Sequence, residues 1–354
     1  MALPHAFYNS PPAYMGFVGF VKLKARAIVQ DVTPGSTYQH GDILVRATSA
    51  DLNLTQEVTK PDVIDSRYDR TVYQLGPKLI DGSIAFPAVY DMGASEGTAN
   101  ETNIVEATFR HAVTRNIQGL LTDFDLDVKY ATTANLNLAD FTYYGCIANT
   151  WQFAVAAEDV INISMDVIGL TREIATTTTL SAEYMKNTRI CTWNDSRVEI
   201  RNSASPGAHK LSENIGGEYV RSFEANINNN ADRFYTLNTY LYPQAIAPTK
   251  RDVTGNVVLL GRHTDLAELA YSNQNFCSET VQIAFGFETK LTLAECQSSF
   301  GTVLPNCVFQ IEEMTLSNEI FETTVNWHSL PAAGTGVNDP LLQNMNPTFE
   351  YPKD

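Results

Sequence analysis

The sequence predicts a mainly β protein with two tandem domains, each a β-sandwich or partly open barrel with one α-helix on its flank. Short stretches such as Phe223 to Asn228 alternate apolar and polar residues with the period of two that half-buried strands show. Asn and Thr are abundant, and Gly and Pro are scattered between these stretches, as is typical of β-rich structure. Several landmarks occur twice in the same order, which predicts one design used twice.

The chain has 354 residues and a net charge of −16. A protein that grips nucleic acid through its phosphates needs a basic surface, so this charge argues against that function. It is compatible with a protein that lets nucleic acid pass without sticking. No run approaches the ~20 apolar residues of a membrane-spanning helix, and we expect no signal peptide because the N-terminus lacks a basic segment followed by an apolar one.

The five cysteines predict neither a disulfide framework nor a zinc site. They are odd in number, widely spaced and without a CxxC pair. We expect buried free thiols in a protein made in a reducing cytoplasm. The cysteines are Cys146, Cys191, Cys277, Cys296 and Cys307.

The first half begins with an expected N-terminal arm at residues 1–16, where three prolines oppose regular structure. The first domain is predicted to cover residues 17–175. Its one clear helix is expected at 103–118, where apolar residues recur at helical spacing. Its strands are predicted at 17–29, 43–54, 71–89, 124–128, 146–155 and 160–170.

The second half follows a Thr-rich linker predicted at 176–187, and its domain is expected to cover 188–330. The stretch 219–260 predicts a strand, a polar turn, an extended crossover and a second strand. A short helix is expected at 264–272, and residues 331–354 predict a C-terminal extended arm. Further strands are predicted at 188–202, 280–287, 303–314 and 319–329.

The duplication rests on matched landmarks. VRATSADLN, which begins at Val45, is matched by VRSFEANIN, which begins at Val220. The helix at 104–109 matches 266–271, and the closing strand at 161–170 matches 321–330. The intervals between matched landmarks drift, as loop insertions would make them do at little cost in free energy. Further matches pair Asp69-Arg70 with Asp232-Arg233, Gly82 with Gly255, and Phe124 with Val281.

A polar face can be assigned by strand alternation if the pairing strands of each half form one sheet. Acids and amides dominate this face, and no base belongs to the set. Such a wall repels phosphate, a property that a DNA conduit needs. The candidate lining residues are Asp51, Asn53, Asp81, Ser83, Asp125, Asp127, Asn162, Ser164, Asp166, Glu224, Asn226, Asn228, Asp252, Thr254, Asn256, Glu322 and Asn326.

Catalytic and metal chemistry finds little support in the sequence. Asp123, Asp125 and Asp127 share one strand face, but calcium ligands usually come from a curled loop. None of the six histidines has HxxxH or HExxH spacing, and GxSxG, P-loop and GxGxxG motifs are missing. We therefore expect no catalytic residues, no metal and no cofactor.

Three stretches resemble the tail tube (major tail) proteins of long-tailed bacteriophages: SFEANINNNADRFYTLN followed by PTKRDVTGN, GPKLIDGSIAFP, and CIANTWQFAVAAEDVINISMDVIGL. The likeness covers most of 17–330 and is strongest at 188–290. It implies a subunit of stacked rings around a DNA channel. Each tube domain would be a β-sandwich with a flanking helix, whose sheet joins its neighbours in a continuous inner barrel.

The resemblance also implies partners. Many members have one domain and form hexameric rings, so two domains imply homo-trimeric, pseudo-sixfold rings, with a hexamer as the alternative. Tail tip or baseplate, tape measure and tail terminator proteins would bind the tube, and viral double-stranded DNA would pass without specific binding. The protein would assemble in the host bacterial cytoplasm and reside in the virion tail, away from any membrane. Contacts from one stacked ring to the next are expected from 55–70, 89–102, 203–218 and the N- and C-terminal arms.

An alternative is a two-domain β-sandwich binding module that recognises carbohydrate or a receptor, as a tail-tip or capsid-decoration protein would. Trp151, Trp193 and Trp327 at strand positions could stack on sugars, although core packing is the favoured interpretation. An enzyme on a β scaffold is the most remote interpretation, because no catalytic constellation is present.

Overall fold

The computed structural model describes residues 17–25, 29–30, 37–38, 43–45, 47–59, 74–91, 104–114, 121–131, 137–174, 188–202, 211–237, 241–261, 263–271, 281–288, 299–317 and 320–330. The predicted arms at 1–16 and 331–354 lie outside these residues, as does the linker at 176–187. Cys277, Cys296 and the Asp69-Arg70 landmark also lie outside them.

The described chain is mainly β, as predicted, with one α-helix in each half. The first half contains β1 (Phe17–Ala25), β2 (Val29–Gln30), β3 (Thr37–Tyr38), β4 (Ile43–Val45), β5 (Ser49–Thr59), β6 (Gln74–Pro87), β7 (Val89–Asp91), α1 (Ile104–Val113), β8 (Phe124–Ala131), β9 (Asn137–Ala156), β10 (Asn162–Gly169) and β11 (Thr171–Ile174). The second half contains β12 (Thr188–Ile190), β13 (Ser196–Asn202), β14 (Val220–Asn228), β15 (Ala231–Phe234), β16 (Ala245–Pro248), β17 (Asp252–Leu260), α2 (Thr264–Tyr271), β18 (Val281–Glu288), β19 (Ser299–Leu304), β20 (Cys307–Ser317) and β21 (Ile320–Ser329).

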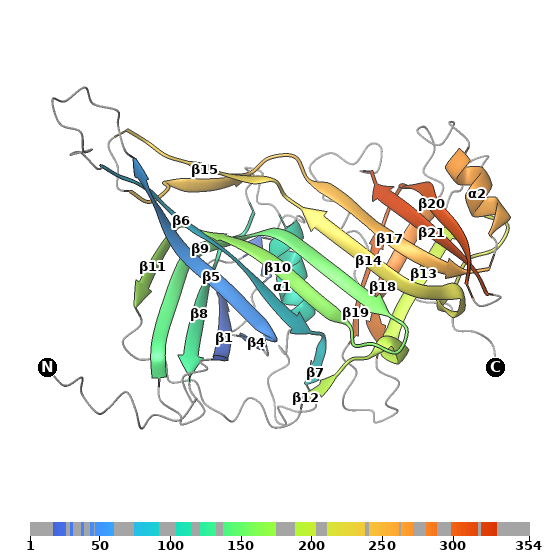
Figure 1. The fold of residues 1–354 in the computed structure, drawn as a ribbon, viewed down its shortest axis with the longest axis horizontal. Coiled ribbons are helices and arrows are strands. Elements are labelled where there is room, and N and C mark those ends of the chain that lie inside the picture. The colour runs from blue at the N-terminus through green and yellow to red at the C-terminus, as the bar shows by residue number, and fades with distance from the viewer. Residues whose placement is uncertain are drawn as a thin grey trace, which may run out of the picture.

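One long antiparallel sheet runs through both halves (Figure 1). Its strand order is β5-β6-β10-β9-β14-β17-β21-β20, so the first four strands come from the first half and the last four from the second. The halves meet where β9 pairs with β14, with Phe153 opposite Ala225. We call this β9–β14 pairing the internal junction.

A second layer packs under the apolar face of the long sheet. In the first half, β1 pairs with β4 and β8, and β8 and β11 pair with the N-terminal part of β9. In the second half the layer is β13-β18-β19. β9 therefore belongs to both layers, and its backbone bends near Gly145, where φ is +59°. The second half has its break at the matching place, between β19 and β20, where Asn306 has φ of +50°.

The strand registers show the same repeat as the sequence. Gly82 lies opposite Leu52, and its match Gly255 lies opposite Ala225. A Cβ on either glycine would clash with the carbonyl oxygen of Asp51 or Glu224, so both positions require glycine. Leu52 is therefore the counterpart of Ala225. Matching the two sequences at Val45 and Val220 instead would shift this correspondence by an even number of positions. Because side chains alternate between the two faces of a sheet, an even shift leaves every residue assigned to the same face.

The closing strands and helices repeat as well. Val167 of β10 lies opposite Gly82, and Trp327 of β21 lies opposite Gly255, so Val167 and Trp327 are counterparts. α1 packs against β9, and α2 packs against β20. Each strand of the first half of the long sheet thus has a counterpart at the same place in the second half: β5 with β14, β6 with β17, β10 with β21, and β9 with β20.

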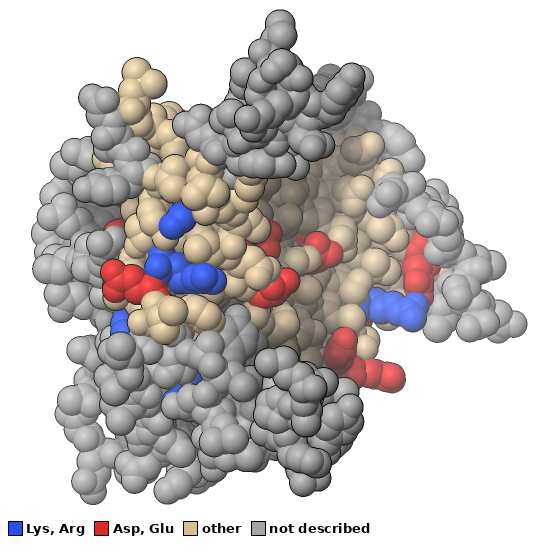
Figure 2. All heavy atoms as spheres, turned by 60° about the vertical axis from the view of Figure 1, so that its left-hand side comes forward, with Lys and Arg blue, Asp and Glu red and all other residues tan. Residues whose placement is uncertain are grey.

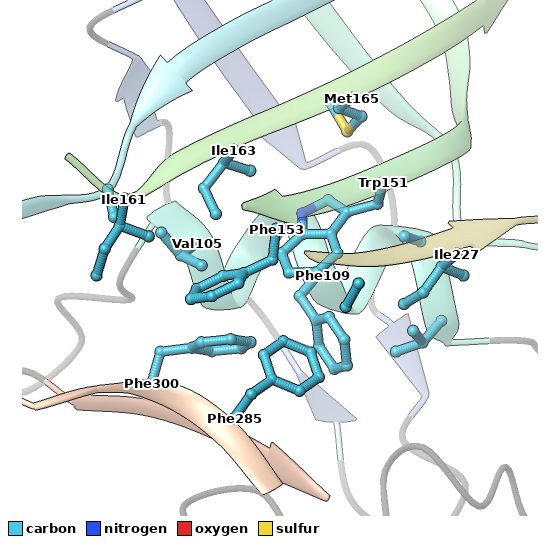
Figure 3. Packing of buried hydrophobic residues seen from close by; sticks show 14 of the residues in the cluster. Val105, Phe109, Trp151, Phe153, Ile161, Ile163, Met165, Ile227, Phe285 and Phe300 are labelled. Atoms are coloured by element: carbon cyan, nitrogen blue, oxygen red, sulfur yellow. The ribbon is translucent and has the colours of Figure 1, made fainter. Parts of the chain in front are cut away.

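The hydrophobic core is shared by both halves (Figure 3). Phe109 of α1 contacts Trp151 of β9 edge-on, with 5.0 Å between ring centroids, and Phe300 of β19 at 5.3 Å. Trp151 is fully buried, and its indole Nε1 donates a hydrogen bond to Thr108 Oγ1 at 3.2 Å. Core packing is confirmed for Trp151 and Trp327, whereas Trp193 is exposed.

Element boundaries differ from the predictions in several places; the strand predicted at 188–202, for example, is two strands, β12 and β13, in different sheets. The strand predicted at 43–54 is two strands, β4 and β5, which lie in different layers. The strand predicted at 146–155 begins at Asn137, because the N-terminal part of β9 also has partners in the second layer. The helix predicted at 103–118 ends at Val113. There the last-turn carbonyls of Ala112 and Val113 are met by side chains from the second half.

Candidate functional site

The polar face of the long sheet is the candidate functional site. Alternation along each strand puts all the predicted lining residues on this face except Asp125 and Asp127. The registers fix their neighbours: Glu224 lies opposite Asn256 on one side and Ala154 on the other, and Ser83 lies opposite both Asp51 and Asp166. The predicted residues that lie on this face are half-buried or exposed. The opposite face supplies the core.

A ladder of side-chain hydrogen bonds crosses four strands of this face. Ser164 Oγ donates to Gln152 Oε1 at 3.0 Å, and Gln152 Nε2 donates to Glu224 Oε1 at 2.7 Å. Asn256 Nδ2 donates to the other oxygen, Glu224 Oε2, at 3.1 Å. The ladder spans β10, β9, β14 and β17, so it crosses the internal junction. It holds a charged carboxylate between two amide donors, an arrangement stronger than a neutral hydrogen bond.

Further carboxylates on the face accept hydrogen bonds from neutral neighbours. Asn53 Nδ2 donates to Asp51 Oδ1 at 2.7 Å. Thr150 Oγ1 donates to Asp166 Oδ2 at 2.6 Å. The donors orient these acids without cancelling their charge, so the face stays acidic.

Gln152 and Thr150 are missing from the predicted set, although they lie in the middle of the face. They alternate with the buried Trp151 and Phe153 along β9, so their outward direction is readable from the sequence. The signal is easily overlooked, because apolar residues dominate the rest of β9.

Two arginines approach the margins of the face, which the predicted base-free set does not anticipate. Arg233 forms an ion pair with Asp81 and donates from Nη2 to the carbonyl oxygen of Ile80 at 2.7 Å. Arg221 forms an ion pair with Glu322. Each base is thus held against a carboxylate. Figure 2 shows acidic side chains (red) in and beside a hollowed stretch of the surface, with basic ones (blue) toward its edges.

The structure places Asp125 and Asp127 away from this face. Both belong to β8, which pairs with β1 and the N-terminal part of β9 in the second layer. Asp127 is 1% exposed, forms an ion pair with Lys24, and accepts a hydrogen bond from Thr142 Oγ1 at 2.7 Å. Asp125 accepts one from the backbone N–H of Gly145 at 2.9 Å. The prediction was wrong for these two residues because it assigned β8 to the long sheet.

Other kinds of site find no support in the part of the chain that the structure describes. No group of three or more His, Cys, Asp or Glu residues there could hold a metal ion. Cys146, Cys191 and Cys307 are buried, as predicted. None of the described helices is long and apolar enough to cross a membrane.

Comparison with known proteins agrees with the resemblance noted in the sequence. No protein among the curated sequences matches this chain. The sequence pattern of one family, described as phage tail tube protein, matches residues 16–320 and so spans most of both halves. The chain therefore belongs to the phage tail tube proteins, structural virion proteins that assemble into a tube.

Proposed function

We propose that this protein polymerises into stacked rings that form a hollow phage tail tube, and that the polar face of the long sheet lines its DNA channel. One observation carries the proposal. The long sheet is a head-to-tail repeat whose two end strands, β5 and β20, pair on one side only among the described strands.

The internal junction supplies the pattern for joining chains. In the order of the long sheet, β9 is the strand of the first half that borders the second half, and β14 is the strand of the second half that borders the first. The two strands pair antiparallel. Their counterparts are β20 and β5. Pairing β20 of one chain with β5 of the next would therefore repeat the internal junction between chains. A head-to-tail contact of this kind closes into a ring when the rotation allows, and closure removes the open edges. Six repeats then require three chains.

The proposed channel wall suits the passage of DNA. Acidic and amide side chains offer phosphate no cation to bind, and their field repels it. Arg221 and Arg233 lie at the margins of this face, and each is paired with a carboxylate. The wall would keep double-stranded DNA mobile, without specific binding.

The same role defines partners and location. We propose that the tube contacts tail tip or baseplate, tape measure and tail terminator proteins, and that it is assembled in the host bacterial cytoplasm without a membrane. A structural role of this kind needs no catalysis.

Electron microscopy and mass measurement test the ring. Purified protein seeded with tail tips should form hollow tubes, and an isolated ring should have a mass of three 39.1 kDa chains. Six chains per ring would contradict the trimer but keep the tube. Dispersed particles that bind glycans and never form rings would favour a binding module instead.

Charge reversal tests the lining. Asp51→Lys with Glu224→Lys places two bases on the proposed wall, while Glu213→Lys changes an exposed acid in the loop before β14. We expect both variants to fold and assemble, and only the double variant to slow DNA ejection from virions. Ejection at the normal rate by the double variant would show that this face does not line the channel.

A further inference from the structure

A ribbon from the second half reaches over the first half at one end of the long sheet. It is formed by β15 and β16, which leave β14 and return to β17, and we call it the strap (Figure 1). Its Arg233 contacts Asp81 and the carbonyl oxygen of Ile80. The carbonyl oxygen of Leu241 accepts a hydrogen bond from the backbone N–H of Lys78 at 2.7 Å. The strap is therefore fixed to β6.

Apolar residues under the strap form a small core separate from the main one. Ile246 of β16 packs with Leu121, Ile147 and Ile168 of the first half, all at most 9% exposed. Ala231 of β15 packs against the same cluster. Ile147 and Ile168 are directly opposite each other on β9 and β10. The strap thus covers a pair of isoleucines that would otherwise face solvent.

The first half has the corresponding ribbon, whose tip residues belong to none of the described apolar clusters. Val58 pairs with Leu75 where β5 and β6 extend beyond the rest of the sheet. We call this extension the arm; it is distinct from the terminal arms predicted at 1–16 and 331–354. In the strap, Ala231 pairs with Pro248. Val58 is therefore the counterpart of Ala231, and Leu75 the counterpart of Pro248. Both pairs are separated in the sequence by the same interval as the matched glycines Gly82 and Gly255. Yet Val58 is 48% exposed and Leu75 is 57% exposed.

The second half has the matching receiving surface, also uncovered. The counterpart of the Ile147–Ile168 pair is Val308 opposite His328, on β20 and β21. Leu170, which also packs against the strap core, has Leu330 as its counterpart. His328 is exposed, and Val308 and Leu330 are half-buried, whereas the two isoleucines are buried. We call Val308, His328 and Leu330 the receiving patch.

We propose that the arm of one chain packs on the receiving patch of a second copy, as the strap packs on the first half of its own chain. This inference rests on the ring proposed above, because the arm lies at the β5 end of the sheet and the patch at the β20 end. A single chain cannot bring these ends together, but a head-to-tail neighbour can. Burial of Val58 against the patch is the expected gain.

Cysteine cross-linking tests the contact directly. Val58→Cys with His328→Cys places a thiol on each side, and each single variant serves as its control. Under mild oxidation, rings of the double variant should give a denaturing-gel ladder that ends at the covalent trimer, because a head-to-tail contact links every chain to the next. A ladder confined to rings, and missing from both single variants, supports the contact.

Two other outcomes separate this inference from the proposed function. Rings seen by electron microscopy that yield no cross-linked species would overturn the arm contact and leave the ring intact. Wild-type protein that forms no rings or tubes would overturn both, since the contact presupposes a neighbour.

A charge on the arm supplies a second measurement. Val58→Asp with Leu75→Asp should leave the monomer folded, because both side chains are exposed, but should weaken ring formation about tenfold or more, since a carboxylate is costly to bury on an apolar surface. Ile174→Asp is the control, because Ile174 is 74% exposed and lies on β11, which pairs with β9 in the second layer. Equal assembly by all three proteins would contradict the arm contact.

Discussion

The two halves of this chain are built from the same parts, but they differ in which contacts are completed. β14 has a strand on each side, whereas its counterpart β5 pairs only with β6 among the described strands. The strap covers buried isoleucines, whereas the equivalent arm leaves Val58 half exposed. The second half thus has a strand partner and an apolar contact in the first half, whereas the first half has no described equivalent of either. In the proposed ring, these open contacts would be completed by neighbouring chains joined head to tail, each chain contributing two repeats.

The largest difference in stability between the two halves is expected for core substitutions on β9 and on its counterpart β20. Trp151 of β9 is fully buried, and its counterpart on β20, Ile311, is half-buried. Trp151→Ala should lower the free energy of unfolding by about 3–5 kcal/mol, as large core truncations do. Ile311→Ala should cost less than half as much in the monomer. Urea denaturation measures both, and equal losses would show that the β20 edge is already as closed as β9.

The free energy of unfolding should depend on pH in the alkaline range because Cys307, the first residue of β20, is buried. Burial raises the pKa of the Cys307 thiol from its ordinary 9.0 to about 12. As pH rises, the thiol therefore ionises in the unfolded chain before it ionises in the folded one. Its contribution to the free energy of unfolding is complete below pH 9. That contribution is lost between pH 9 and about 12, by about 1.4 kcal/mol per pH unit. Cys307→Ala should make the stability curve flatter than wild type over this range. Identical slopes for the two proteins would contradict the prediction, whatever the variant's stability at pH 7.

The hydrogen-bond ladder offers a smaller test of the internal junction. Gln152 lies opposite Asn226 and bonds Glu224, while the register of β20 makes Glu313 its counterpart. Gln152→Glu would place two carboxylates together and should cost about 1 kcal/mol of unfolding free energy near neutral pH. The loss should shrink at low pH as a carboxylate is protonated. Gln152→Met, which removes the bond without adding charge, separates repulsion from the lost hydrogen bond.

The converse change at the open end should have the smallest effect. In the proposed ring, position 313 would lie opposite Asn53 of the next chain and diagonal to Asp51. Glu313→Gln would replace an acid with the amide found at the internal junction. We expect ring formation to rise about threefold, since like charges on diagonal cross-strand neighbours cost a few tenths of a kcal/mol. Light scattering during seeded assembly measures the rate. Slower assembly would argue against this register.

Much of the fold was predictable because strand alternation has a strict period. Phe223, Ala225 and Ile227 face the core as the pattern required, and the positions between them form the polar face. The same rule failed at Asp127, because alternation tells which side a residue takes but not which sheet its strand joins. That choice depends on pairing between distant strands, here β8 with β1, which local sequence does not encode.

The strap was harder to predict for a related reason. The sequence predicts only a polar turn and an extended crossover there, since the apolar residues of the strap, Ala231 and Ile246, are far apart and alone show no clear period. Its purpose emerges only when Ile147 and Ile168 come together beneath it. By contrast, the two glycines at 82 and 255 carry a local steric demand, and their match is visible in the sequence.

The internal junction has a consequence for the order of events during synthesis. β9 leaves the ribosome before β14, so a first half that folded during synthesis would display a strand edge onto which the second half could add. When the second half is complete, β20 presents the counterpart of that edge at the other end of the sheet. In the proposed ring, the next chain adds to it by the same step. Folding of one chain and growth of the ring would then be successive rounds of a single reaction, strand addition to a waiting edge, first within a molecule and then between molecules.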